Sequence, residues 1–141
     1  MPELQEACMD GAQWKHIEEY CREQYGVVPD EYRLLANYLP QVVEGIIATR
    51  EAVTRTTEGT LPEKVRELIM VAVEVALKKP PILHAKRAVE AGATVREVAE
   101  VVAICMYLAG MASYVVAGYP ALKAAEEQDG ERKTVEYSRG M

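Results

Sequence analysis

Hydrophobic residues along most of this chain recur with the three- to four-residue spacing of amphipathic helices. The clearest stretch spans residues 60–93, where apolar side chains occupy positions 65, 68, 69, 72, 73 and 76. Between Leu68 and Leu77 the only polar residue is Glu74, which indicates a helix buried on nearly every side. Pro80 and Pro81 end this helix, and Pro81 suits the first turn of the next one, so the stretch predicts a tight helical hairpin.

Capping patterns, in which Thr or Asp is followed three residues later by Glu or Gln, mark other helix starts. They occur at Asp10, Thr60 and Thr94. Further apolar stripes predict helices from about residue 30 to 39 and from 40 to 55. The segment 95–125 is predicted to form two helices, or one that is broken near residues 110–113.

No segment carries a strand signal, so the sequence predicts an all-α bundle of about six to seven helices around the core hairpin. We expect a single domain over residues 1–141, because this length suits one domain with a proper core. Within it, residues 1–9 are expected to form a loose arm. The polar tail, residues 126–141, shows no pattern and is expected either to be disordered or to lie on a neighbour.

Charge and hydropathy narrow the classes of partner. The net charge is −6, and residues 1–60 hold 11 acidic and 5 basic side chains against 11 of each in residues 61–141. There is no basic stripe, so nucleic-acid binding is not expected. Residues 101–119 carry no formal charge, but they are rich in Ala and Gly. They indicate a buried or intersubunit helix rather than a membrane span.

The cysteines at positions 8, 21 and 105 form neither a C-x-x-C motif nor a zinc-ligand spacing. Such a scattered set, with no signal peptide, is expected of a cytoplasmic protein. The simplest interpretation is that these side chains are small buried hydrophobic groups. A thiol redox protein that uses Cys21 or Cys105 is a further alternative.

The run RELIMVAVEVAL, followed by a short loop and HAKRAVEAGATVREVAEVV, resembles the core of the carboxymuconolactone decarboxylase family, whose superfamily includes the alkylhydroperoxidase D-like proteins. The resemblance covers about residues 34–125. It implies an alkylhydroperoxidase D-like helical bundle that forms a homo-oligomer, either a trimer or a hexamer. The peroxidase branch carries C-x-x-C four residues ahead of its histidine, whereas residues 78–83 here contain no cysteine. The chain is therefore similar to the decarboxylase branch, and no C-x-x-C peroxidase activity is expected.

By position, Glu67 and His84 match the glutamate and the histidine of that branch. The resemblance implies a lyase that performs acid/base chemistry of the decarboxylation type on a small carboxylated molecule, without a cofactor. His84 would be the general acid, with Glu67 orienting its ring. Lys79 and Arg87 are candidates for holding the substrate carboxylates. No metal is expected, because the possible ligands lack a paired spacing such as H-x-x-x-H.

Other interpretations of these residues stay open. His84 can be purely structural, and Glu67 can pair with Lys64, Arg66 or Arg87 across the helices. The chain as a whole can be a non-catalytic helical oligomer that binds a ligand or partner in the former active-site cleft. The substrate is not identified by family membership.

Overall fold

A computed structural model describes residues 10–140 of the 141-residue chain, and every regular element in that range is helical. The all-α prediction is therefore confirmed. Seven α-helices in the described range have nine or more residues, as the sequence predicts, and the short segments α7 and η1 join two of them. The loose arm predicted for residues 1–9 lies outside the described residues. In chain order the elements are α1 (Gly11–Tyr25), α2 (Asp30–Tyr38), α3 (Pro40–Thr54), α4 (Glu63–Ala76), α5 (Ile82–Glu90), α6 (Val95–Ala109), α7 (Met111–Ser113), η1 (Tyr114–Gly118) and α8 (Tyr119–Arg139).

The internal contacts of the chain group it into two compact units, Met1–Arg55 and Thr56–Met141. In the first unit, α1 and α2 both pack against α3 around a small core. Asp10 begins α1 by accepting a hydrogen bond from the backbone N–H of Ala12 at 2.8 Å, as a helix N-cap does. This division into units does not test whether residues 1–141 form a single domain, which stays a prediction. The core side chains of the first unit are Ile17, Tyr20, Cys21, Val28, Ala36, Val43 and Ile47.

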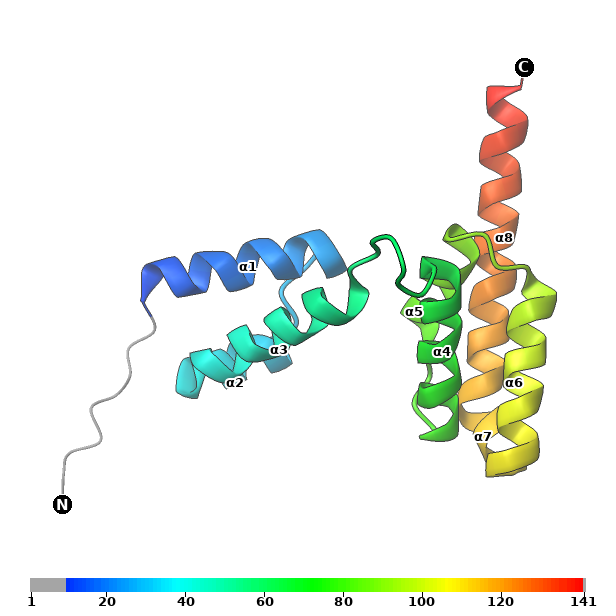
Figure 1. The fold of residues 1–141 in the computed structure, drawn as a ribbon, viewed down its shortest axis with the longest axis horizontal. Helices are drawn as coiled ribbons and strands as arrows, with labels where there is room; N and C mark the ends of the chain where they lie inside the picture. Colours follow the sequence, from blue (N-terminus) through cyan, green and yellow to red (C-terminus); the bar gives the residue numbers. More distant parts are fainter. Residues whose placement is uncertain (1–9, 141) are drawn as a thin grey trace. The chain divides into compact units, whose positions relative to one another are not determined.

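The second unit contains α4 to α8 and is held together by small side chains. Helices α5 and α6 both pack against α4, and α8 runs along α5 and α6 (Figure 1). Valine and alanine fill this core because short side chains let helix backbones approach closely. The buried residues are Val71, Val75, Ala85, Val89, Val98, Val102, Cys105, Ala117, Ala121, Ala124 and Ala125.

The helical segment after Thr94 is broken at Gly110, as the sequence predicts. Gly110 ends α6 with a φ of 91°, a left-handed conformation that glycine adopts without strain. The chain then passes through α7 and the π-helical turn η1 before α8 begins. A Cβ atom on Gly118 would lie 2.6 Å from Cγ1 of Val102, so only glycine permits this close approach to α6. Within residues 10–140, no helix is long and apolar enough to cross a membrane.

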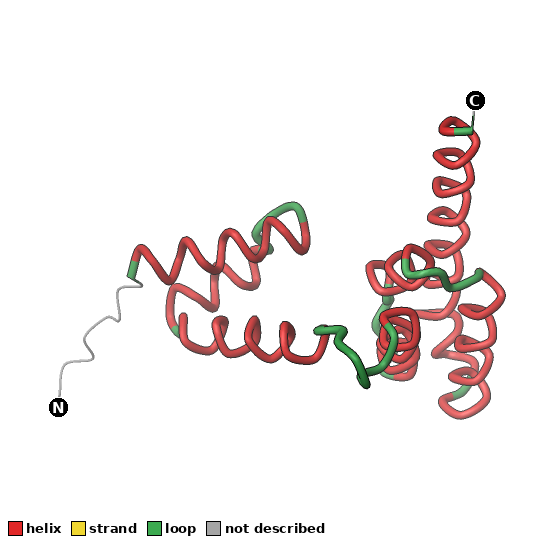
Figure 2. Tube along the Cα trace, turned by 45° about the horizontal axis from the view of Figure 1, so that its top comes forward, coloured by secondary structure: helices red, strands yellow, loops and turns green. Residues whose placement is uncertain are grey.

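Two local features differ from the sequence-based expectation. Thr60 does not cap α4, because its hydroxyl donates to the carbonyl of Thr57 at 2.7 Å and Pro62 occupies the N-cap position. The polar tail is helical as far as Arg139 and is part of α8, whose last turns continue past α5 and α6 (Figures 1 and 2). Asp129 supports these turns by pairing with Lys133 at 2.6 Å, and the hydrogen bond from Lys133 holds the pKa of Asp129 below its ordinary value.

Candidate functional site

The elbow between α4 and α5 is built by a tight helix-ending turn. The N–H of Lys79 donates to the carbonyl of Glu74 at 2.8 Å, and that of Lys78 donates to Val75 at 3.0 Å, which is the Schellman pattern. Lys78 sits in the left-handed region with a φ of 57°, where glycine is usual. Pro81 is buried and precedes the first residue of α5 rather than lying inside its first turn. The predicted hairpin is thus confirmed, with α5 folding back along α4.

The far end of α5 is fixed by a second turn of the same kind. Gly92 has a φ of 99°, and the N–H of Ala93 donates to the carbonyl of Ala88 at 2.8 Å. Thr94 and Glu97 then form the predicted capping box of α6, with both reciprocal hydrogen bonds present. Because an isolated nine-residue helix is marginal in water, these end turns and its packing against α4 and α8 hold α5 in place.

Glu67 and His84 meet across this hairpin. Nδ1 of His84 lies 2.7 Å from Oε2 of Glu67, a short distance typical of charge-assisted hydrogen bonds. The Glu67 side chain is 6% exposed and that of His84 is 14% exposed. The structure therefore places the two predicted site residues in direct contact, with the carboxylate inside and the imidazole nearer the surface.

This contact determines what the imidazole can do. With Glu67 as a carboxylate, Nδ1 is the protonated nitrogen and donates the hydrogen bond. Nε2 is then the nitrogen left to exchange a proton with another molecule. A ring held in one orientation by a buried carboxylate, with one nitrogen left for chemistry, is an arrangement suited to general acid/base catalysis.

Two of the three basic residues that the sequence offers as partners of Glu67 form contacts elsewhere, Lys64 and Arg66. Lys64 pairs with Glu97 at 3.1 Å and so ties the start of α4 to the start of α6. Nη2 of Arg66 donates to the hydroxyl of Thr56 at 2.5 Å and to the carbonyl of Leu61 at 2.9 Å. Arg66 therefore anchors the loop that leads into α4, and the guanidinium is largely buried there.

The two predicted substrate-binding residues lie on either side of His84 along the chain. Lys79 is exposed in the elbow, directly before Pro80. Arg87 is half-buried on α5, three residues after His84. The side chains of His84 and Arg87 therefore leave α5 on the same side. Their role toward a substrate stays a prediction.

Neither described cysteine is in a reactive environment. Cys21 lies in the core of the first unit, and Sγ of Cys105 donates to the carbonyl of Ala72 at 3.3 Å in the core of the second. Burial raises the pKa of both thiols above the ordinary value, which disfavours the reactive thiolate. Within residues 10–140, no group of three or more His, Cys, Asp or Glu side chains is arranged to hold a metal ion.

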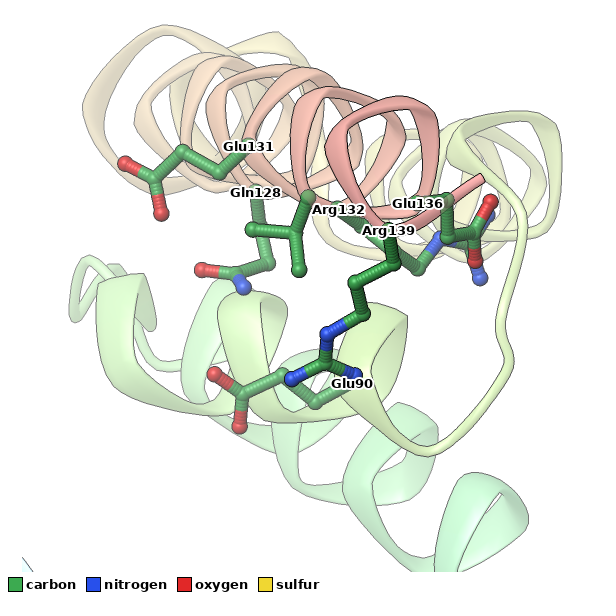
Figure 3. Close-up of a pocket in the computed structure, with 7 residues that line it drawn as sticks. Glu90, Gln128, Glu131, Arg132, Glu136 and Arg139 are labelled. Atoms are coloured by element: carbon green, nitrogen blue, oxygen red, sulfur yellow. The ribbon is translucent and has the colours of Figure 1, made fainter. Parts of the chain in front are cut away.

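A separate pocket of about 360 Å³ lies in the second unit, between the end of α5 and the C-terminal half of α8 (Figure 3). Neither Glu67 nor His84 lines it. The sequence did not predict this pocket, because residues 126–141 show no apolar stripe. A signal was present, since Gln128, Arg132, Val135 and Arg139 recur at the four-, three- and four-residue steps of one helix face.

Comparison with known proteins places this geometry in a family. No curated protein matches the chain. A crystal structure from Burkholderia xenovorans LB400, provisionally named a carboxymuconolactone decarboxylase, has the same fold, with a TM-score of 0.75. The two sequences are 23% identical, and the match covers 87% of this chain and 96% of that one. The sequence pattern of the carboxymuconolactone decarboxylase family matches residues 40–126, nearly the range expected from the resemblance. That match spans more than half of the sequence, so the chain belongs to the carboxymuconolactone decarboxylase family.

Proposed function

We propose that this protein is a lyase that decarboxylates a small carboxylated molecule by acid/base chemistry, without a cofactor. The observation that carries the proposal is the 2.7 Å contact between Nδ1 of His84 and the buried carboxylate of Glu67. Family membership supports the reaction type.

In the proposed reaction, the bond between the substrate and its carboxylate breaks and CO₂ leaves. The electron pair remains on the substrate as an extended enolate, which an unsaturated lactone stabilises by delocalisation. Protonated His84 then donates the proton on Nε2 to the enolate carbon, and solvent restores that proton. Glu67 stabilises the imidazolium and fixes its orientation. Lys79 and Arg87 are proposed to hold the substrate carboxylates, with the arginine able to bind in a bidentate manner.

The test compares rate and stability in the same variants, with release of CO₂ from a carboxymuconolactone as the activity assay. His84→Ala should lower the rate by about 10²–10⁴-fold, the usual contribution of a positioned acid or base. It should also cost about 1–3 kcal/mol of stability, because Glu67 is left buried without its partner. His84→Gln retains a donor toward Glu67, so it should restore most of the stability but none of the rate.

His16→Ala is the matched control, because His16 is an exposed histidine on α1. It should change neither quantity. If His84→Gln decarboxylates at the rate of the unmodified protein, His84 is structural and the proposal is wrong.

We also propose that the protein functions as a homo-oligomer, a trimer or a hexamer. The end of α6 presents large apolar side chains to solvent: Ile104 is 59% exposed, Leu108 75% and Tyr107 86%. Contiguous apolar surface of this kind marks an interaction site. Sedimentation velocity at micromolar concentration should show an assembled species, and Leu108→Glu should shift it toward the monomer. A monomeric unmodified protein at that concentration would contradict the proposal.

A further inference from the structure

The pocket beside α8 has the size of a small-molecule site and is formed by two separate helices (Figure 3). Its volume of about 360 Å³ falls within the range of ligand pockets. One wall is Glu90, the last residue of α5, and the other is a face of α8 between Gln128 and Arg139. The pocket is distinct from the Glu67–His84 site, and its use as a binding site does not depend on the decarboxylase proposal.

The pocket carries unpaired negative charge from both helices, Glu90 from α5 and Glu131 from α8. Glu90 and Glu131 both line it, and neither forms an ion pair with any side chain among residues 10–140. Glu90 also lies at the C-terminal end of α5, where the helix dipole adds partial negative charge. Together these groups favour an ammonium group of a ligand.

A guanidinium group of α8 lines the same pocket. Arg139 forms no ion pair within the described part of the chain, and in Figure 3 its guanidinium reaches from α8 toward Glu90. Arg132 also lines the pocket, but its Nη2 donates to Asp129 at 2.9 Å and its Nε is buried, so this guanidinium is held within α8.

We infer that this pocket binds a small zwitterion, a molecule with an ammonium group and a carboxylate a few carbon atoms apart. The ammonium group pairs with Glu90 and Glu131, and the carboxylate accepts hydrogen bonds from the guanidinium of Arg139. The methylene groups between them lie on Val135, the apolar residue of the lining. Glu136, a third carboxylate in the lining, leaves the pocket with an excess of one negative charge and disfavours purely anionic ligands.

The experiment is an NMR titration of the full-length protein with 4-aminobutanoate, with butanoate and butylamine as probes of one charge each. We expect saturable shifts at the backbone amides of Glu90 and Val135. Glu131→Gln and Arg139→Gln should each weaken binding about tenfold, and each single-charge probe should bind about tenfold more weakly than the zwitterion. Glu126→Gln is the matched control, because Glu126 is exposed on α8 outside the lining, and it should bind like the unmodified protein.

Two results would overturn the inference. One is the absence of saturable shifts at these amides up to tens of millimolar 4-aminobutanoate. The other is butylamine binding as tightly as the zwitterion, or both lining variants binding as tightly as the unmodified protein, since the acidic and basic groups of the pocket would then not act together.

Discussion

Gly118→Ala tests whether the close approach of η1 to α6 determines how the second unit packs. In an unconstrained helix position, replacing glycine by alanine stabilises by about 0.5–1 kcal/mol. At Gly118, however, the added Cβ would lie 2.6 Å from Cγ1 of Val102 and 3.2 Å from Cδ2 of Tyr114. Carbon atoms prefer to be about 3.5–4.0 Å apart, so helices must shift, and overpacking a core costs about 1–3 kcal/mol. We expect a net destabilisation of about 1–2 kcal/mol.

The assay is urea unfolding, followed by circular dichroism, of a double-mutant cycle. Val102→Ala alone removes a buried side chain and should cost about 2 kcal/mol. It also removes the atom that the new Cβ would meet. The free energy of unfolding lost in the double variant should therefore be about 1–3 kcal/mol smaller than the sum of the losses in the two single variants. Gly130→Ala is the control, because its Cβ would meet nothing within 4 Å. Equal stabilisation by Gly118→Ala and Gly130→Ala would refute the packing argument.

Two further predictions concern the elbow and the thiols. Lys78→Gly should stabilise the protein by about 1 kcal/mol in urea unfolding, because glycine adopts the left-handed conformation of this position without strain. Lys79→Gly is the control and should not stabilise the protein. Equal effects of the two substitutions would contradict the assignment of the turn. In a Cys8→Ser chain, iodoacetamide should modify Cys21 and Cys105 far more slowly in the folded state than in urea, since burial raises the pKa of both thiols above the ordinary value. The thiolate fraction, and hence the rate in the folded state, should rise with pH, and a thiol that reacts fast at pH 7 in the folded state would contradict the burial of these side chains.

The helix pattern was predictable where local chemistry alone determines it. Asp10 and Thr94 cap helices as the sequence indicates, because their side chains reach the backbone of the first turn. Thr60 does not, because its hydroxyl is used within the preceding turn and Pro62 begins α4 instead. The left-handed Lys78 was not predictable, since the usual signal for that conformation is glycine. Helix α8 beyond Glu126 lacks an apolar stripe because most of its surface is exposed, so periodicity gave no indication of it.

The candidate site was predictable in part, because its hairpin is determined by local sequence. The Pro80–Pro81 elbow ensures that α5 folds back on α4, and the family resemblance indicated which carboxylate and which imidazole to consider. The distance between Glu67 and His84 depends on the exact turn at Lys78 and on helix packing, which residue spacing does not determine. The spacing from Gln128 to Arg139 indicates one wall of the pocket beside α8. The local sequence does not indicate that Glu90 forms the other wall, because that depends on long-range packing of α5 against α8.

The packing of α8 against α5 also determines when the site can form as the protein is made. The buried face of α5 includes Ala85 and Ala88. Ala85 belongs to the same core as Ala121 and Ala125 of α8, which follow it by more than thirty residues. A ribosome releases the chain from its N-terminal end, so the helix that carries His84 emerges before the helix that covers it. Until α8 has left the exit tunnel, α5 has only α4 and α6 to pack against, and nascent chains that stop before Tyr119 leave its alanine face open to water.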